Sequence, residues 1–456
     1  MKYSIQEVAE IVGGELINTA DSSITNVVFD GRKATAGSLF VPITWGNDGH
    51  NFIQGAIDNH ASATLWAGDH QNTPTNFPTI VVQDTLKAFQ KLAIHYLHQI
   101  NPKVVAISGS NGKTTTKDFT AAIGATTFKT VKTPQNFNNE IGVPTTILAM
   151  PEDTELLVIE FGMDRLGDLD ILSNMIQPDI AVLTMIGEAH IEFFKTRDRI
   201  ADGKIEIVNG LRPGGTLVYN GDEPLLVERA EKHNNLKTST FGLKSDNQLF
   251  ATEIELTPVS ASFITNQSNT RFTLPLTGRY NVDNALAAIS VGHLLGISDE
   301  KIAEALENAP VTENRTEWIQ GNYGGEILSD VYNANPTAMK EVLNFFQTTV
   351  HTTGKKIVVL GDMLELGTAG PQLHADIAAS LDPTQVTEVF LIGELMQNLA
   401  DALVDKYNPS QIHHYAGNQK TELTKALKAT LYPHDLVLLK ASHGSHLETI
   451  VEELRK

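Results

Sequence analysis

Apolar residues recur along this chain in two spacings, one typical of helices and the other of strands. Ser4 and Glu7 have the spacing of a helix-capping box, and Val8, Ile11 and Val12 follow at helical intervals. The chain is therefore predicted to begin with a short amphipathic helix. From residue 24 to about residue 82, short apolar runs alternate with turn-rich pieces, which is the pattern of several short strands.

A longer helix is predicted from about Thr85 to Gln99. The pair Asn101-Pro102 follows it and marks a break, because a residue before proline is pushed out of the helical region. The apolar run that starts at Val104 then predicts a buried strand. The first domain is therefore expected to span residues 1–100.

Strand-like runs, rich in apolar residues, recur along the rest of the chain at intervals that leave room for helices. They lie at residues 104–107, 156–159, 180–183 and 216–219, and again at 356–360, 388–392 and 436–439. Strands that alternate with helices build a parallel sheet covered by helices. We therefore predict an α/β protein of three domains, with a central parallel-sheet domain at residues 101–310 and a Rossmann-like domain at residues 311–456.

Charge and composition narrow the classes of partner. The chain has 456 residues, with 34 Lys plus Arg and 54 Asp plus Glu, so its formal net charge is −20. Such a charge repels a phosphate backbone and an anionic membrane, so neither nucleic acid nor a membrane is expected as a partner. The absence of cysteine excludes disulfides, thiolate metal sites and a cysteine nucleophile. With no apolar signal segment and no run as long as a membrane span, a cytoplasmic protein is expected.

The strongest chemical signal is the run Ser108-Gly109-Ser110-Asn111-Gly112-Lys113-Thr114-Thr115-Thr116. It lies between a predicted strand and a helical stretch that begins near Lys113, which is the context of a phosphate-binding loop. The glycines let backbone N–H groups approach phosphates, Lys113 can contact the terminal phosphates, and the Thr114 hydroxyl can bind Mg²⁺. Ile107 occupies the first glycine position of the G-x-x-x-x-G-K-[ST] pattern, so only G-x-x-G-K-T remains. A glycine-rich turn before a helix is the alternative.

Two further polar residues follow predicted strands. Glu160 ends the run at 156–159, where a carboxylate of an open α/β sheet reaches the ligand crevice and could bind Mg²⁺. His190 follows the strand at 180–184 in the same way. Either residue alone is more often a solvated acid or a structural histidine, so both assignments depend on the phosphate loop.

With these motifs the sequence resembles the Mur ligase family, ATP-dependent enzymes that build the peptide of bacterial cell-wall precursors. The resemblance covers nearly the whole chain. Three segments are most similar to the member that joins D-alanyl-D-alanine to UDP-N-acetylmuramoyl-tripeptide: Asn136–Pro144, Asp330–Pro336 and Gly361–Gly367. The resemblance implies an N-terminal α/β domain for the UDP-sugar, a central P-loop ATPase domain and a C-terminal Rossmann-like domain.

The resemblance also implies how ATP and two Mg²⁺ ions are held. The family's ATP-binding residues fall on Gly109, Ser110, Asn111, Gly112, Lys113, Thr114, Thr115, Asn281, Asn284, Arg315 and Asp330. Thr114 and Glu160 would share one Mg²⁺, and His190 would hold a second. Asp330, from the third domain, would meet the ribose when the domains close. Tyr280 stands where a histidine is common in the family.

Lys204 falls where the family carries a lysine that CO₂ modifies to a carbamate. A protonated lysine beside two Mg²⁺ ions would be repelled, whereas a carbamate supplies the hard oxygen donors that Mg²⁺ prefers. Carbamylation of Lys204 is therefore a hypothesis, with an ordinary solvated lysine as the alternative. The implied catalytic residues are Lys113, Glu160, His190 and Lys204, and the implied metal-binding residues are Thr114, Glu160, His190 and Lys204.

Segments that resemble the family's substrate contacts occur in all three predicted domains. The residues expected to bind substrate are Asp30, Arg32, Asp48, Gly49, His50, Asn138, Asn139 and Asn335. Gly31 replaces a common serine in the first of these segments. The segment Lys440–Ser445 resembles an amine-substrate segment, with Ala441 and His443 in place of glycine and arginine.

The implied reaction activates the tripeptide carboxylate with ATP to an acyl phosphate, which the amine of D-alanyl-D-alanine then attacks. Lys113 and the Mg²⁺ ions would offset the repulsion between the two anions. A free α-amino group has a pKa of about 7.7–8.0, so a weak base or water would be sufficient. The alternatives are a sibling ligase that adds one amino acid, a folylpolyglutamate-type ligase, an NTP-driven switch and a catalytically dead homologue.

Overall fold

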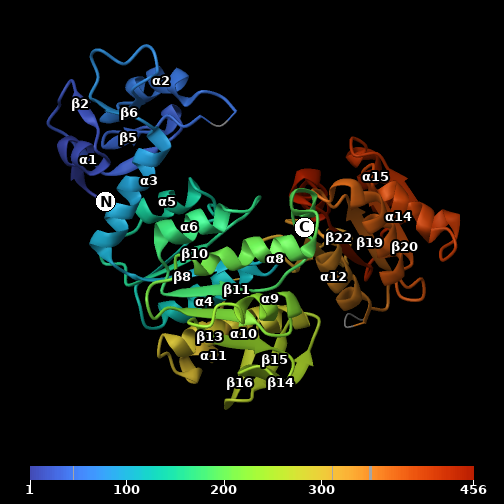
Figure 1. Cartoon of the computed structure of the whole chain (residues 1–456). Coiled ribbons are helices and arrows are strands. Elements are labelled where there is room, and N and C mark those ends of the chain that lie inside the picture. The colour runs from blue at the N-terminus through green and yellow to red at the C-terminus, as the bar shows by residue number, and fades with distance from the viewer. Residues whose placement is uncertain (45, 311, 349–351) are drawn as a thin grey trace.

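The computed structural model describes residues 1–44, 46–310, 312–348 and 352–456, and within them it contains three main sheets and a two-stranded ribbon. The sheets follow one another along the chain, from the blue N-terminal part through the green and yellow centre to the orange and red C-terminal part (Figure 1). Helices alternate with strands in all three, so the predicted α/β class is confirmed. No helix in these four ranges is long and apolar enough to cross a membrane.

The first sheet has the strand order β2-β7-β6-β5-β4 and is parallel except for the pair β2 and β7. Its strands are β2 (Glu15–Ile17), β4 (Asn26–Val28), β5 (Ser38–Phe40), β6 (Ala63–Ala67) and β7 (Thr79–Val82), and β1 (Tyr3–Ser4) pairs with β3 (Ser23–Ile24). The accompanying helices are α1 (Ile5–Val12), α2 (Ile53–Asp58) and α3 (Thr85–Ile100). The predicted capping box is present, because Ser4 and Glu7 each accept a hydrogen bond from the other's backbone N–H.

The central sheet has the order β16-β15-β14-β13-β12-β11-β8-β10-β9. The neighbours from β9 to β14 are parallel, and β14 to β16 add an antiparallel extension. Its strands are β8 (Lys103–Ser108), β9 (Thr130–Lys132), β10 (Leu156–Glu160), β11 (Ile180–Leu183), β12 (Thr216–Asn220), β13 (Lys237–Gly242), β14 (Leu249–Leu256), β15 (Ala261–Thr265) and β16 (Ser268–Leu274). Its helices are α4 (Lys113–Ala125), α5 (Gly142–Leu148), α6 (Asp168–Ile176), α7 (Ile191–Phe194), α8 (Arg197–Ile205), α9 (Pro224–Ala230), α10 (Arg279–Leu294) and α11 (Asp299–Glu307).

Both faces of the central sheet are buried, which explains why its strands are continuous aliphatic runs. Along β8, Val104 and Ala106 belong to one hydrophobic cluster, whereas Val105 and Ile107 belong to the other. Residues of α5, α6, α8 and α9 fill the first cluster, and residues of α4, α10 and α11 fill the second. This packing holds the carboxyl end of β8, where the glycine-rich loop begins, between two layers of helices.

The C-terminal sheet has the order β17-β18-β22-β19-β20-β21, with β17 the one antiparallel strand of the set described. Its strands are β17 (Glu317–Gln320), β18 (Glu326–Asp330), β19 (Lys356–Gly361), β20 (Glu388–Ile392), β21 (Ile412–Tyr415) and β22 (Leu436–Lys440). Its helices are α12 (Pro336–Thr348), α13 (Gly370–Ala375), α14 (Met396–Leu403), α15 (Lys420–Thr430) and α16 (Glu448–Leu454). The expected boundary at residues 310 and 311 includes Val311, which lies outside the described residues.

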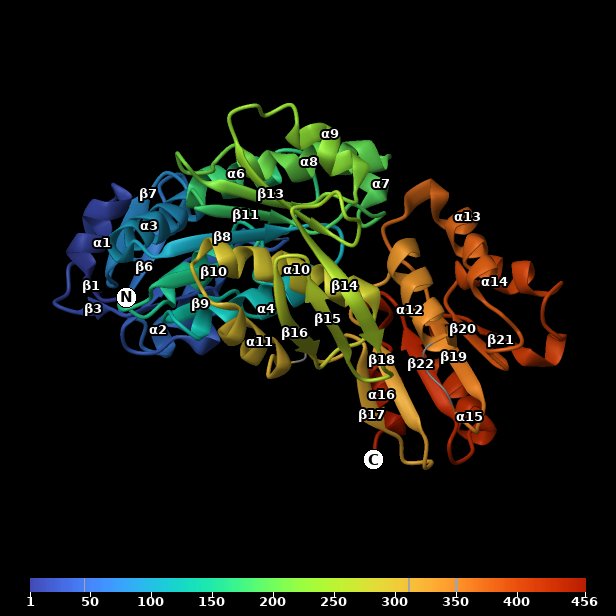
Figure 2. The same cartoon turned by 90° about the horizontal axis from the view of Figure 1, so that it is seen from below.

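The three sheets are joined in two different ways. One continuous hydrophobic cluster runs from the first sheet and α3 into the central sheet. The hydrophobic clusters of the C-terminal sheet are separate from this shared cluster. The half-buried Ile191 packs against both the shared cluster and one cluster of the C-terminal sheet. Across this second joint the contacts are mainly polar, and Trp318 Nε1 donates to the Pro258 carbonyl at 2.8 Å. Figure 2 shows the β14 to β16 extension beside β17 and β18 at this joint.

Candidate active site

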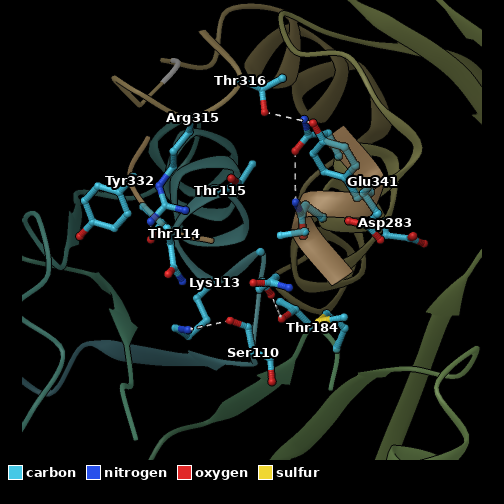
Figure 3. A pocket seen from close by; sticks show the side chains of 18 of the residues that line it. Ser110, Lys113, Thr114, Thr115, Thr184, Asp283, Arg315, Thr316, Tyr332 and Glu341 are labelled. Atoms are coloured by element: carbon cyan, nitrogen blue, oxygen red, sulfur yellow. Dashed lines mark hydrogen bonds between the residues drawn. The ribbon is translucent and has the colours of Figure 1, made fainter. Parts of the chain in front are cut away.

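The glycine-rich loop between β8 and α4 forms one wall of a pocket between the central and C-terminal sheets (Figure 3). Gly112 begins α4 in the left-handed region, at φ 81°. A Cβ atom at Gly112 would collide with the Asn284 Oδ1 atom, and one at Gly109 would collide with Thr184 Oγ1. Both glycines are therefore required by the close approach of other parts of the site, which the sequence pattern alone did not reveal.

The side chain of Lys113 is folded back onto the loop that precedes it. Its Nζ donates hydrogen bonds to the carbonyl oxygens of Gly109, at 2.8 Å, and Ser110, at 3.4 Å. Desolvation in the pocket lowers the pKa of Lys113, and the nearby Glu160 carboxylate partly offsets this. The loop thus holds a cation at the helix N-terminus, in the place where a polyphosphate would need one.

Thr114 and Glu160, which were both expected to bind Mg²⁺, lie together beneath the loop. The buried Glu160 ends β10, its Oε2 accepts from Thr114 Oγ1 at 2.9 Å, and its Oε1 accepts from Asn138 Nδ2 at 2.9 Å. Arg315 Nη2 donates to the same Thr114 hydroxyl at 3.1 Å. A hydroxyl and a carboxylate oxygen, both in the pocket lining, are ligands that suit Mg²⁺.

The C-terminal sheet contributes the opposite wall of the pocket. Asp330 ends β18, and its carboxylate accepts from Lys440 Nζ at 2.5 Å. The buried Lys440 also donates to the Asn333 carbonyl at 3.0 Å, so it joins the ends of β18 and β22. The structure therefore brings the predicted Arg315 and Asp330 to the same pocket as the phosphate loop.

Asn281 and Asn284 lie on the first turns of α10, inside the pocket lining. Asn284 Nδ2 donates to Asn281 Oδ1 at 3.2 Å, and Thr116 Oγ1 donates to Asn284 Oδ1 at 3.4 Å, so α10 and α4 are tied at this point. Beside them the Tyr280 hydroxyl lies 3.0 Å from Thr316 Oγ1, and desolvation raises the pKa of Tyr280.

Four acids that line the pocket were not predicted from the sequence: Asp222, Glu223, Asp283 and Glu341. Asp283 on α10 and Glu341 on α12 both line the pocket and are labelled in Figure 3. Desolvation in the pocket and the neighbouring Asp222 carboxylate raise the pKa of Asp283 to about 8. Desolvation likewise raises the pKa of Glu341 to about 7. Asp283 lies between the predicted Asn281 and Asn284 but has no predicted role of its own, and no motif surrounds Glu341.

The predicted metal-binding residues His190 and Lys204 are placed differently. His190 lines the pocket, and its Nδ1 lies 2.7 Å from Oε2 of Glu365. This contact with the imidazole holds the pKa of Glu365 below its usual range. Lys204 does not line the pocket; it is buried, and its Nζ donates to Ser108 Oγ at 3.3 Å. Burial, followed by the charge of Lys113, lowers the pKa of Lys204 well below its usual range.

Several residues expected to bind substrate are engaged with the protein itself. The Asp30 carboxylate pairs with the Arg32 guanidinium at 2.8 Å, and Asn139 Oδ1 accepts from the N–H groups of Ile141 and Gly142 at the start of α5. Asn335 pairs with Asn111 of the phosphate loop. Of the expected substrate residues, Asn138 lines the pocket, whereas the group on the first sheet does not: Asp30, Arg32, Asp48, Gly49 and His50.

Asp48 and His50 form a cluster with His70, a residue that no sequence signal marked. His50 Nε2 accepts from the Ala67 N–H at 3.3 Å, so its Nδ1 carries the proton and donates to Asp48 at 2.7 Å. Both nitrogens of His70 face acceptors, the Gln71 carbonyl at 2.5 Å and Asp48 Oδ2 at 2.8 Å. Both contacts are satisfied when the ring carries two protons, and the hydrogen bond to Asp48 raises the pKa of His70. Asp48, His50 and His70 together could hold a metal ion. However, the ring nitrogens of both histidines already take part in the hydrogen bonds just described.

Comparison with known proteins gives full-length matches. Residues 107–292 match the Mur ligase middle domain, and residues 314–443 match the Mur ligase, glutamate ligase domain. A UDP-N-acetylmuramoyl-tripeptide–D-alanyl-D-alanine ligase of Bacillus subtilis (strain 168) is 38% identical over 457 residues, covering 100% of this chain and 98% of that protein. The crystal structure of MurF from Acinetobacter baumannii has a TM-score of 0.89 at 28% identity and covers 100% and 99% of the two chains. MurF ligase from Thermotoga maritima in complex with ADP has a TM-score of 0.81 at 27% identity, over 94% and 96% of the two chains.

Proposed function

This chain belongs to the Mur ligase family, and we infer from that membership and from its site that it joins D-alanyl-D-alanine to UDP-N-acetylmuramoyl-tripeptide with ATP. It is an ATP-dependent ligase, like the full-length relatives described above. The observation that carries the specific reaction is the 38% identity over the whole chain to a ligase with that name. The product is the UDP-linked pentapeptide from which peptidoglycan is made.

The arrangement of the pocket supports the ATP half of this reaction. The phosphate loop, Arg315 and Asp330 come from two different sheets and face one pocket. The loop N–H groups and Lys113 would bind the terminal phosphates, and Asp330 would accept from a ribose hydroxyl. Since Lys113 already bonds to the loop carbonyls, its ammonium is held in place before the nucleotide arrives.

The residues present also fit Mg²⁺. Thr114 and Glu160 would hold one ion, because their oxygens lie 2.9 Å apart in the pocket lining. His190 and a carbamate on Lys204 would hold a second. Bound Mg²⁺ supplies Lewis-acid stabilisation of charge on the transferring phosphoryl group. Around it, Lys113 and Arg315 would offset the charge of the phosphates while the substrate carboxylate approaches.

Carbamylation of Lys204 is a separate proposal, and its buried setting supports it. Burial favours the neutral amine, the form whose lone pair attacks the carbon of CO₂. The new N–C bond forms as one C=O π bond of CO₂ breaks and its electron pair moves to oxygen. The nitrogen releases one proton to water, which leaves an anionic carbamate. The nearby cation Lys113 would stabilise that charge.

The carbamate is tested with ¹³C-bicarbonate. The wild-type chain should show a carbamate ¹³C resonance that disappears on acidification, and the Lys204→Gln variant should lack it. Lys195→Gln, which removes an exposed lysine nearby in the sequence, serves as the control and should retain it. An unmodified Lys204 in an enzyme that is fully active without bicarbonate would refute this proposal.

The ligase reaction is tested by phosphate release from Mg-ATP with UDP-N-acetylmuramoyl-tripeptide. Three amine conditions are compared: D-alanyl-D-alanine, single amino acids and no amine. Release only with the dipeptide, together with a UDP-linked pentapeptide by mass, is the expected result. Release with a single amino acid would point to a sibling ligase, and turnover without either substrate would point to an NTP-driven switch. We further propose that the chain works in the cytoplasm, where ATP and UDP-linked sugars are supplied.

A further inference from the structure

We propose that Tyr332 is a positioning residue of the nucleotide site, whose ring holds the Arg315 guanidinium against the phosphate loop. The Arg315 Cζ atom lies 4.2 Å from the centroid of the Tyr332 ring, and the two side chains lie side by side in Figure 3. At this distance the ring face attracts the cation. The inference rests on the proposed binding of ATP, but it concerns a residue that acts through Arg315.

Arg315 depends unusually strongly on this ring. Its Nη2 donates to Thr114 Oγ1, yet its Nε is buried without a hydrogen-bond partner. Within the described residues the guanidinium forms no ion pair with a carboxylate. The Tyr332 ring is therefore the main contact that compensates for the partial desolvation of this charge.

The backbone on both sides of Arg315 is fixed in an uncommon conformation. Asn314 and Thr316 have positive φ values of 59° and 51°, and such a value is rare for a β-branched residue. Thr316 is held by the Tyr280 hydroxyl, and Asn314 Oδ1 accepts from Ser329 Oγ at 2.8 Å. The backbone thus aims the Arg315 side chain at the loop, and the ring determines where the guanidinium comes to rest.

Tyr332 belongs to the C-terminal part of the chain, two residues after the end of β18. The exposed His443 ring stacks on Tyr332, with centroids 5.6 Å apart and planes inclined by 21°. The ring is thus held from a segment that follows β22. Arg315 is consequently held near Thr114 only while the C-terminal sheet is docked, and nucleotide affinity becomes sensitive to the position of that sheet.

The test is calorimetric titration of the full chain with ADP in the presence of Mg²⁺, which needs neither the peptide nor the amine. Tyr332→Leu should weaken ADP binding about 3- to 30-fold, the range that corresponds to loss of a cation–π contact. Tyr332→Phe keeps the ring and should stay within about twofold of the wild type. Tyr432→Leu removes a distant, 63% exposed tyrosine in the turn between α15 and β22 and should have no effect.

A double-mutant cycle separates positioning from a general structural role. In an Arg315→Ala background, Tyr332→Leu should produce no further loss of ADP affinity. An equal loss in both backgrounds, or no loss in the wild-type background, would overturn the proposal even if the protein melts normally. Failure of the wild-type chain to bind ADP would instead contradict the proposed function itself.

Discussion

The side-chain amides of Asn111 and Asn335 donate hydrogen bonds to each other across the joint between the central and C-terminal sheets. Asn111 Nδ2 lies 3.2 Å from Asn335 Oδ1, and Asn335 Nδ2 lies 2.6 Å from Asn111 Oδ1. Asn335 Oδ1 also accepts from the Ala338 N–H in the first turn of α12. The phosphate loop is therefore tied to the start of a helix in the neighbouring sheet.

Because of these two hydrogen bonds between Asn111 and Asn335, a negative charge at residue 335 should weaken ATP binding. In Asn335→Asp the carboxylate can still accept from Asn111 but cannot donate to it, and it adds a negative charge beside the phosphate loop. We expect the KM for ATP to rise about tenfold, the effect of about 1.4 kcal/mol of repulsion. Steady-state kinetics at saturating peptide and dipeptide give this value. Asn408→Asp changes an exposed residue far along the chain and should leave the KM unaltered.

Gly112 should not tolerate a side chain. Gly112→Ala incurs the cost of about 1–2 kcal/mol for a left-handed residue and also collides with Asn284, so ADP binding should be lost. Gly214 separates these two effects, because it has a similar φ of 83° and an added Cβ would have open space. Gly214→Ala should lower the melting temperature without weakening ADP binding. Retained binding in Gly112→Ala would show that the loop adjusts freely.

His70 predicts a pH dependence of stability. Because Asp48 raises the pKa of His70 in the folded chain, the charged pair stabilises the fold fully below the unfolded pKa of about 6.5. The contribution is lost as the pH rises through the raised folded-state pKa. Melting curves from pH 5.5 to 8.5 should therefore show a fall that is shallower in His70→Gln. The slope that remains comes from Asp283 and Glu341, whose pKa values are raised in the folded chain. His98→Gln, on the exposed side of α3, should keep the wild-type slope.

The hydroxyl of Tyr280 should contribute to stability rather than to chemistry. Tyr280→Phe removes the bond to Thr316 and leaves a buried hydroxyl without that partner, so we expect a loss of about 1 kcal/mol of unfolding free energy. Denaturant unfolding measures the loss. Tyr432→Phe, at an exposed position, provides the reference. An unchanged free energy would mean that water replaces the tyrosine hydroxyl at Thr316.

The parts of the fold that the sequence predicted well share a physical property. The parallel strands are buried on both faces, so they form unbroken aliphatic runs, and the run at 180–183 coincides with β11 (Ile180–Leu183). The β14 to β16 extension was missed because its strands alternate buried and exposed residues and carry many polar side chains. Local spacing identifies an amphipathic strand less readily than a buried one.

The candidate site shows the same division. The phosphate loop and Thr114 were predictable because they belong to one contiguous motif. Glu160 was predictable because it directly follows a run of apolar strand residues. The contacts of Asn335, Tyr332 and His70 were not, because each partner lies far away in the sequence or in a segment without a motif. Their roles depend on contacts between segments that are far apart in the sequence, and short sequence patterns do not predict such contacts.

The unequal joints between the sheets have a consequence for how the protein melts and how it is made. Since one apolar core serves the first two sheets, they should unfold together, whereas the C-terminal sheet has its own clusters and should give a second calorimetric transition. During synthesis, the ribosome would release the first two sheets complete before the third exists. The nascent chain would then display the phosphate loop without Arg315, so a competent nucleotide site would arise only at the last step of folding.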